Sequence, residues 1–377
     1  MYKKFFMGIA AMAALTLVSC SSEDLNSVSD NSSKNEAISF DGYLGRSAVA
    51  VNGSRGSELT KEKLKTDGFG VFGNYNSTGG QNFGSNLFDN VKVYSSSTAD
   101  PVKWTYDNTK YWPTQGHIDF LAYAPYVKNT PLNTTLEGKM TSCINFTVVN
   151  KVTDQKDLLW ANAENQTNAN KPVSFTFNHA LAKIGYTVKL KGAYSNATIT
   201  LNKITLAGSK DETTKAFYSE GTIDLATKIT SPATNPWTST STDKQNFNWF
   251  SGDYVLPVPA SGTEPSPSHP DKDNNGNIDK DKDYLFVIPQ DFSKTEDGAD
   301  KLFVIVEYTI KYTNHNDNEM SEMKSTVSSP IVMNFLQGKA YMINLTIGLT
   351  PIEFDAEVTP WTDTDNPNTD IDINTWN

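Results

Sequence analysis

Short apolar runs alternate with clusters of glycine, asparagine, serine and threonine along the chain from Ala37 onward. Helical periodicity is almost absent, and only Glu58–Lys65 is expected to form one or two helical turns. Many short strands separated by turn signals are typical of β-sandwiches, so the pattern predicts an all-β protein. The predicted strands are Ile38–Leu44, Gly68–Gly73, Val91–Val93, Ile118–Tyr123, Ile144–Val149, Val173–Phe177, Ile184–Leu190, Ala197–Leu206, Gly221–Leu225, Phe247–Pro257, Tyr284–Pro289, Leu302–Tyr312, Ile331–Phe335, Ala340–Leu349 and Ile352–Pro360.

The stretch Trp104–Tyr126 is rich in aromatic residues. Its second half, Ile118–Tyr123, follows a turn at Thr114–Gly116 and is rich in large apolar side chains. Such a segment favours a strand that is buried on at least one face. Because aromatic rings bury much area per residue, we expect these rings to nucleate a core. The alternative is a solvent-facing platform on which sugars stack.

The strand-rich region is too long for one hydrophobic core, and its length favours two domains. The polar run Asn165–Lys171 has the composition of a loop, and Phe175 opens a new alternating run. We therefore predict an N-terminal β-sandwich over residues 37–177 and a C-terminal β-sandwich over residues 178–377, with a boundary near Asn178.

The first nineteen residues have the layout of a secretory signal. Lys3 and Lys4 precede an apolar segment, Phe5–Thr16, which is too short to span a membrane. The sequence Leu-Val-Ser-Cys then places Cys20 at a lipobox-like cleavage site. Residues 1–19 are thus predicted to be a lipoprotein signal peptide and Cys20 a lipidated residue. The polar residues 20–36 are expected to form a disordered tether.

The charge and cysteine content exclude several classes of protein. Removing residues 1–19 takes away Lys3 and Lys4 and no acidic residue, so the formal net charge falls from −11 to −13. A net acidic surface argues against nucleic acid as a partner. Only Cys143 remains besides Cys20, so no intrachain disulfide framework is possible. We interpret Cys143 as a small buried hydrophobic residue rather than a nucleophile.

No motif predicts an enzyme. The four histidines are spread through different turns and strands, and no zinc-ligand pair, nucleophile elbow, Walker loop or dinucleotide fingerprint occurs. His179 is interpreted as a packed or bonded imidazole rather than a catalytic base. No cofactor is expected to be required.

One loop matches the first nine positions of a calcium-binding EF-hand loop. Oxygen donors stand at positions one, three, five and nine, with glycine at position six. The twelfth position is Lys282 rather than glutamate, which removes the bidentate ligand. The alternative is a charged, flexible hairpin tip. The candidate calcium ligands are Asp271, Asp273, Asn275 and Asp279.

Two motifs resemble a known family. The run Trp-x-Tyr-x-x-x-Lys-Tyr-Trp-Pro from Trp104 to Pro113, followed by an apolar strand and Ala-x-x-Pro, resembles the fimbrillin (Mfa-like) family of type V pilin lipoproteins. Residues 175–184, FTFNHALAKI, resemble the start of the C-terminal domain in that family. Smaller matches lie at residues 157–159, 287–290 and 338–361.

This resemblance implies two tandem transthyretin-like β-sandwich domains and a structural role as the stalk, tip or accessory subunit of a cell-surface fimbria that serves adhesion. It implies other pilin subunits as partners, and an outer-membrane lipid anchor before processing. It also makes the C-terminal run a candidate donor strand, because apolar and polar residues alternate there. The alternative is an ordinary closing strand. The donor-strand residues would be Ile352, Phe354, Ala356 and Val358.

The arginines suggest how assembly starts. The chain has two arginines among its 32 basic residues, and both Arg46 and Arg55 follow the first predicted strand, Ile38–Leu44. Glycine and serine around them predict a flexible, exposed connection. In the family that the chain resembles, an Arg-specific protease removes the first strand and leaves a groove for a donor strand. Arg55 has the more flexible flank, but either residue fits.

Two other functions remain open at the level of sequence. A glycan-binding surface lipoprotein would use exposed aromatic side chains, for which Trp237, Trp249 and Trp376 are the candidates. A fimbrial anchor that does not polymerise would differ only in keeping its N-terminal strand.

Overall fold

The computed structural model describes residues 36–44, 59, 61–80, 82–95, 97, 102–194, 196–228, 234–260, 262–270, 284–313, 320–348 and 353–360. The prediction of an all-β chain is confirmed. Within these ranges the helical segments are α1 (Lys61–Asp67) and the short 3₁₀ turn η1 (Val152–Asp154). The helix begins a few residues after the predicted Glu58. None of the helices in the described ranges has the length and apolar composition needed to cross a membrane.

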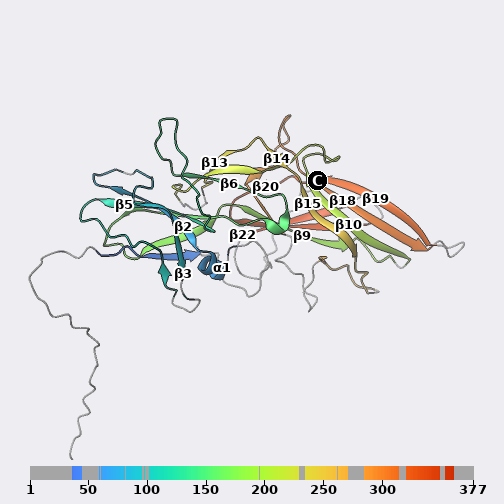
Figure 1. The fold of residues 1–377 in the computed structure, drawn as a ribbon. Coiled ribbons are helices and arrows are strands. Elements are labelled where there is room, and N and C mark those ends of the chain that lie inside the picture. The colour runs from blue at the N-terminus through green and yellow to red at the C-terminus, as the bar shows by residue number, and fades with distance from the viewer. Residues whose placement is uncertain are drawn as a thin grey trace, which may run out of the picture. The chain divides into compact units, whose positions relative to one another are not determined.

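The N-terminal strands form one seven-stranded sheet in the order β1-β8-β7-β5-β2-β3-β4 (Figure 1). β1 pairs with β8 in parallel, and the other neighbours are antiparallel. An isolated bridge joins Ala37 to Tyr111, so the residues before β1 meet the segment that follows β4. The strands are β1 (Phe40–Leu44), β2 (Phe69–Asn76), β3 (Phe88–Ser95), β4 (Trp104–Thr105), β5 (His117–Ala124), β7 (Leu159–Gln166) and β8 (Val173–His179).

This sheet folds around an aromatic core. In β8, buried Val173, Phe175 and Phe177 alternate with polar residues that are exposed, as the period of two along a strand requires. The buried residues of this core all lie between Ile38 and Phe177. The predicted nucleus is therefore confirmed for most of its rings. Phe120 and Trp112 are buried, whereas Tyr111 is 54% exposed.

The turn that precedes β5 requires a glycine. Gly116 has a φ of +76°, and a Cβ atom there would lie 2.2 Å from the carbonyl oxygen of Asn76. Only glycine adopts this conformation without strain and avoids that overlap. The predicted turn at Thr114–Gly116 is thus confirmed.

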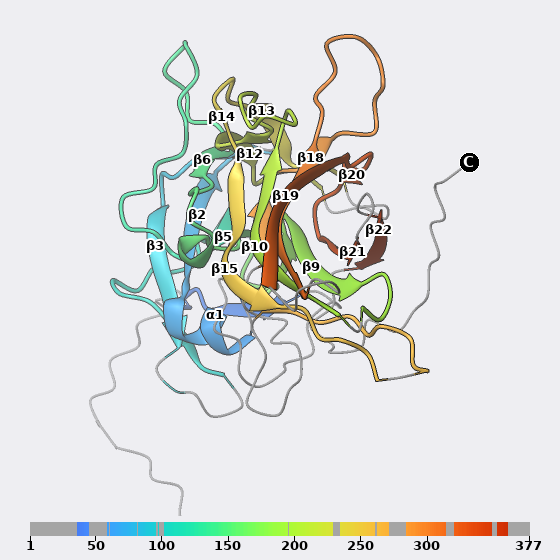
Figure 2. The same cartoon turned by 90° about the vertical axis from the view of Figure 1, so that its right-hand side faces the viewer.

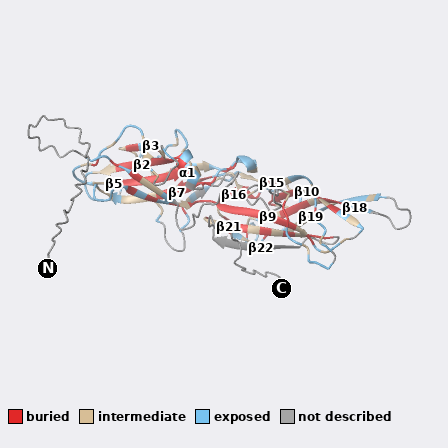
Figure 3. Ribbon diagram, turned by 90° about the horizontal axis from the view of Figure 1, so that it is seen from below, coloured by how far each residue is buried: buried red, intermediate tan, exposed pale blue. Residues whose placement is uncertain are grey.

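The later strands form two four-stranded sheets, β15-β10-β18-β19 and β16-β9-β21-β22 (Figures 1 and 2). Leu201 and Val306 of the first sheet share one core with Val188 and Ile343 of the second, which makes this pair a sandwich. β9 is buried along most of its length (Figure 3). These strands are β9 (Ala182–Leu190), β10 (Ala197–Ala207), β15 (Phe247–Val255), β16 (Leu285–Val287), β18 (Phe303–Thr313), β19 (Met320–Pro330), β21 (Lys339–Ile347) and β22 (Glu353–Pro360).

Short strands complete the fold. β6 (Cys143–Thr147) pairs with β12 (Glu220–Asp224), and β12 also pairs with β13 (Trp237–Thr240). Ile144 and Val148 consequently belong to the core of the sandwich although they precede Asn178. The division into two domains at that residue stays a prediction. The remaining short strands are β11 (Phe217–Tyr218), β14 (Lys244–Gln245), β17 (Gln290–Asp291) and β20 (Asn334–Phe335).

Candidate assembly site

The backbone of β1 and of the residues just before it is bonded on both edges. On one edge β1 runs parallel to β8, from Phe40 opposite Val173 to Leu44 opposite Phe177. On the other edge, residues 36–38 pair with residues 110–112. The amide of Ile38 donates to the Lys110 carbonyl at 2.9 Å, and the amide of Trp112 to the Glu36 carbonyl at 2.9 Å. We call the space between these two edges the β1 slot.

The inward side chains of β1 fill an aromatic pocket. Ile38 is 2% exposed and Phe40 5% exposed. Phe40 lies against four rings whose centroids are 5.4–5.8 Å from its own, mostly edge-on or tilted. Such ring pairs add about 0.5–1.5 kcal/mol each beyond the area they bury. The four rings belong to Phe88, Tyr106, Phe120 and Phe175.

The space at Gly42, the next inward position after Phe40, is narrow. A Cβ atom on Gly42 would lie 3.2 Å from Phe69 Cε1, 3.5 Å from Trp104 Cζ2 and 3.6 Å from a ring atom of Phe177. An alanine would fit there if the Phe69 ring moved by a few tenths of an ångström, whereas a larger side chain would overlap three rings. At the positions of Ile38, Phe40 and Gly42, in that order, the slot therefore has room for an apolar, a large aromatic and a very small side chain.

Tyr106 fastens β1 through its hydroxyl. The hydroxyl donates to the carbonyl of Ile38 at 2.8 Å, and the amide of Lys110 donates to the same hydroxyl at 3.2 Å. Burial raises the pKa of Tyr106 above its ordinary value of 10.0. The phenol thus links Ile38, just before β1, to Lys110 on one edge of the slot, and it stays protonated near neutral pH.

No local sequence pattern reveals this arrangement, because it depends on long-range contacts. Trp104, Tyr106 and Trp112 all stand in the aromatic motif, so the motif marks the part of the chain that lines the slot. Their contact with β1 is a pairing between residues some seventy positions apart, which no local pattern reveals. The second sequence feature that marks the slot is the small residue Gly42, two positions after Phe40.

The C-terminal strand is held differently. β22 pairs antiparallel with β21, from Thr346 opposite Glu353 to Lys339 opposite Pro360. It is the end strand of its sheet, so in the described part of the chain only one of its edges is paired. The predicted donor residues Phe354, Ala356 and Val358 lie on β22, and Ile352 lies outside the described residues.

Most of the other predicted site residues also lie outside the described residues. They are Cys20, Arg46, Arg55, Asp271, Asp273, Asn275 and Asp279. Over the ranges that the structure covers, no group of three or more histidine, cysteine or acidic side chains is placed to hold a metal ion.

The interpretation of His179 as a packed imidazole is confirmed. His179 is buried, and its Nδ1 atom lies 2.8 Å from Asp157 Oδ2. The same oxygen accepts a hydrogen bond from the backbone amide of Leu59 at 3.3 Å. This buried carboxylate therefore fixes the chain at Leu59, just after the segment that contains both arginines.

Other sequence interpretations need correction. Cys143 is half-buried rather than buried, and burial raises its pKa, so the reactive thiolate is disfavoured. Trp249 is 2% exposed and packs edge-on against Tyr186. Trp237 is half-buried, and its Nε1 donates to the Ala180 carbonyl at 2.7 Å. Trp376 lies outside the described residues. Trp249 is therefore a core residue, and the Trp237 ring is held through its nitrogen.

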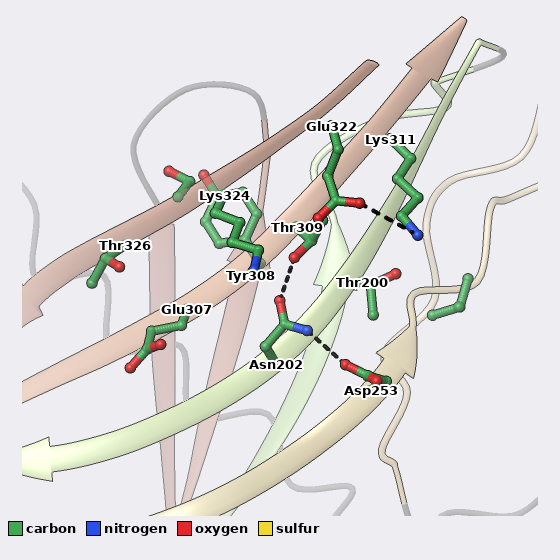
Figure 4. A pocket seen from close by; sticks show the side chains of 12 residues that line it. Thr200, Asn202, Asp253, Glu307, Tyr308, Thr309, Lys311, Glu322, Lys324 and Thr326 are labelled. Carbon is green, nitrogen blue, oxygen red and sulfur yellow. Dashed lines mark hydrogen bonds and ion pairs between the residues drawn. The ribbon is translucent and has the colours of Figure 1, made fainter. Parts of the chain in front are cut away.

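A polar hollow of about 510 Å³ lies on the sheet β15-β10-β18-β19 (Figure 4). Asn202 donates to Asp253 and accepts from Thr309, both at 2.8 Å, and Lys311 pairs with Glu322 at 3.6 Å. Of the described residues that line it, Tyr308 alone is aromatic, and its side chain is buried. Several of its polar groups thus bond to one another.

Comparison with known proteins assigns the chain to a family. The model of the fimbrillin-like family matches residues 59–361. The chain belongs to the fimbrillin-like family. The match includes the aromatic motif that lines the β1 slot and the whole of β22. Membership supports a role as a subunit of a cell-surface fimbria.

Of the three solved structures described next, the first has the same fold as this fimbrillin-like chain. A fimbrial protein of Bacteroides vulgatus is 22% identical with a TM-score of 0.57, and the match covers 87% of this chain and 100% of that one. A protein of Bacteroides uniformis assigned to cell adhesion is 15% identical with a TM-score of 0.46, covering 88% and 100%. The C-terminally truncated tip fimbrial protein Mfa3 of Porphyromonas gingivalis is 11% identical with a TM-score of 0.33, covering 79% and 95%. No curated protein sequence matches the chain.

Proposed function

We propose that this fimbrillin-like chain is a structural subunit of an adhesive fimbria, assembled by proteolytic removal of β1 and donation of a strand from the next subunit. The observation that carries the proposal is the position of β1. β1 pairs with β8, the residues just before it pair with residues 110–112, and the segment that joins β1 to Leu59 contains both arginines of the chain.

Removal of β1 would leave an acceptor. The edge of β8 and the backbone of residues 110–112 would lose their partners, and the pocket of Phe40 would open to water. Each buried backbone group left without a partner costs about 1–3 kcal/mol. An incoming strand would restore these bonds through its main chain, while its alternate side chains set the register.

Export and anchoring come before assembly in this proposal. The signal layout of residues 1–19 supports export as a lipoprotein whose acylated Cys20 holds the subunit at the outer membrane. Cleavage at Arg46 or Arg55 would separate the lipidated N-terminus and β1 from the rest of the chain. A protein that is never cleaved would serve as an anchor.

Limited digestion of the purified protein with an Arg-specific protease tests the proposal. We expect cleavage between residues 44 and 59 followed by polymers, visible by electron microscopy and as high-mass species in size-exclusion chromatography. The double variant Arg46→Ala/Arg55→Ala should stay monomeric. The matched control, Lys128→Ala/Lys301→Ala, loses two exposed positive charges elsewhere and should polymerise like the parent. Cleaved protein that remains monomeric, or polymers from the double arginine variant, would contradict the mechanism.

We also propose calcium as a ligand of the loop that contains Asp271, Asp273, Asn275 and Asp279. The supporting observation is the spacing of oxygen donors around Gly276. Isothermal titration with calcium chloride should give heat that disappears in Asp271→Ala/Asp273→Ala. A titration without heat at millimolar calcium, or equal heat from that variant, removes the site.

A further inference from the structure

The polar hollow on the sheet β15-β10-β18-β19 is built by side chains from all four strands (Figure 4). Asp253 of β15, Asn202 of β10, Thr309 of β18 and Lys324 of β19 all contribute to its lining. Its volume of about 510 Å³ is in the range of pockets that bind small molecules. The hollow lies on a different sheet from the β1 slot, and strand removal and donation, as proposed above, involve none of its residues.

An irregularity of the sheet lies at the centre of the hollow. In the ladder between β10 and β18, consecutive residues of β18 face Leu201 and Lys203, so Asn202 is an extra residue. The register between β10 and β15 shifts at the same place, where Gly252 and Asp253 both stand opposite Asn202. Bulges re-aim a side chain and are over-represented next to active sites. The sheet thus departs from regular pairing at a residue that lines the hollow.

The amide of Asn202 is held in a fixed orientation. Its Nδ2 donates to Asp253 Oδ1 and its Oδ1 accepts from the Thr309 hydroxyl, both at 2.8 Å. Asp253 is exposed, and a carboxylate has two acceptor oxygens, so it can accept a further hydrogen bond. The amide nitrogen likewise has a second hydrogen to donate. A ligand would meet groups that are already oriented, which lowers the entropic cost of binding.

The charges in and beside the hollow balance. Glu307 pairs with Lys203 at 3.2 Å and Glu322 with Lys311 at 3.6 Å. Among the described residues this leaves Lys324 without an ion-pair partner, and its side chain is exposed. With Lys203 included, three positive and three negative side chains surround the hollow, so it favours a neutral ligand over an ion. The negative set is Asp253, Glu307 and Glu322, and the positive set is Lys203, Lys311 and Lys324.

The lining favours a ligand rich in hydroxyl groups. Pockets for drug-like ligands are mainly apolar and aromatic, whereas carboxylate, amide, ammonium and hydroxyl groups predominate here. A hydroxyl group both donates and accepts, so it can bond to each of these. Val255, which is 56% exposed, adds an apolar contact of the kind that the C–H groups of a sugar ring can cover.

We propose that the hollow binds a neutral oligosaccharide. Asp253 accepts from a sugar hydroxyl, the amide of Asn202 and the ammonium of Lys324 donate to sugar oxygens, and Val255 lies against a ring. An extended peptide is a poorer match, because it needs an unpaired strand edge, whereas β10 and β18 are inner strands. The inference goes beyond the proposed function, since it requires neither cleavage nor a second subunit.

A glycan array tests the proposal with the uncleaved full chain. The array carries neutral N-acetyllactosamine chains of animals, neutral glucans and mannans of plants and yeast, and sialylated and sulfated chains. We expect binding to neutral chains, and the class that binds identifies their source. If no neutral chain binds, or if the charged chains bind more strongly, the proposal is overturned. Either result leaves the proposed assembly untouched.

Variants locate the site with the neutral chain that binds best. Lys324→Ala should weaken binding about tenfold or more, because a charge-assisted hydrogen bond is lost. Its urea midpoint should equal that of the parent, since the side chain is exposed and has no ion pair in the described part of the chain. The control Lys301→Ala removes an exposed lysine outside the hollow and should stay within about twofold of the parent. Parent-like binding by Lys324→Ala, or an equal loss in the control, overturns the site.

Discussion

β1 and β22 share a sequence pattern but are held in different ways. β1 is an end strand that pairs with β8, the residues just before it pair with residues 110–112, and Phe40 lies among four aromatic rings. β22 is an end strand bonded to β21, with its second edge unpaired in the described part of the chain. The comparison teaches that the neighbours of a strand, more than its own residues, decide how firmly it is held.

Deleting residues 352–377 should have the largest effect on assembly. Without the donor, we expect the cleaved protein to form no polymers, while the slot and its core remain folded. Sedimentation would measure the polymers, and circular dichroism the folded monomer. A shorter deletion of residues 362–377, which keeps β22, serves as the control and should assemble normally. Filaments from the longer deletion would remove β22 from the mechanism.

On the β1 side of the comparison, Phe40→Ala should strongly lower the unfolding free energy of the uncleaved protein. Removal of a buried phenylalanine costs about 3–5 kcal/mol of unfolding free energy, because the cavity among the rings closes only partly. Tyr43→Ala changes an exposed residue of the same strand and should cost less than about 0.5 kcal/mol. Urea denaturation of both variants measures the difference. Similar losses in the two variants would mean that the inward face of β1 does not hold the slot closed.

Tyr106→Phe should have a smaller effect that depends on pH. The variant keeps the ring but loses the hydrogen bond to Ile38, at a cost of about 0.5–1.5 kcal/mol. In the parent, the folded pKa of Tyr106 is raised, so its contribution is complete below pH 10 and is lost as the pH rises through the folded value. Denaturation curves from pH 8 to above 10 should converge for parent and variant. A constant difference across this range would exclude the phenol as the titrating group.

The polar hollow should contribute least to filament growth and to unfolding free energy. Lys311 and Glu322 are each about half exposed, and ion pairs of this kind are worth about 0–1 kcal/mol. We expect Lys311→Ala/Glu322→Ala to leave filament growth and unfolding free energy nearly unchanged. Time courses of light scattering after cleavage would compare this variant with the parent. A large loss of assembly would make the hollow, rather than the slot, the contact between subunits.

The sequence by itself determined much of the strand content. In β8, β9 and β21 the apolar residues recur at every second position, and these strands lie where the pattern placed them. The aromatic motif marked the residues that line the β1 slot, because large rings are stable only when buried together. The alternation at the C-terminus likewise predicted β22. Local side-chain chemistry was sufficient in each of these cases.

The tertiary structure alone decided which strands meet. β19 is polar and was not predicted, and it forms because β18 offers it a partner along eleven residues. β7 was not predicted, because its second half is polar. It forms because it pairs with β5. β6 pairs with β12 across the predicted domain boundary. The two edges of the β1 slot come from residues far apart in the chain. Pairing between strands is long-range, and the backbone bonds that create it are the same for every residue type except proline, so no local pattern encodes the partner.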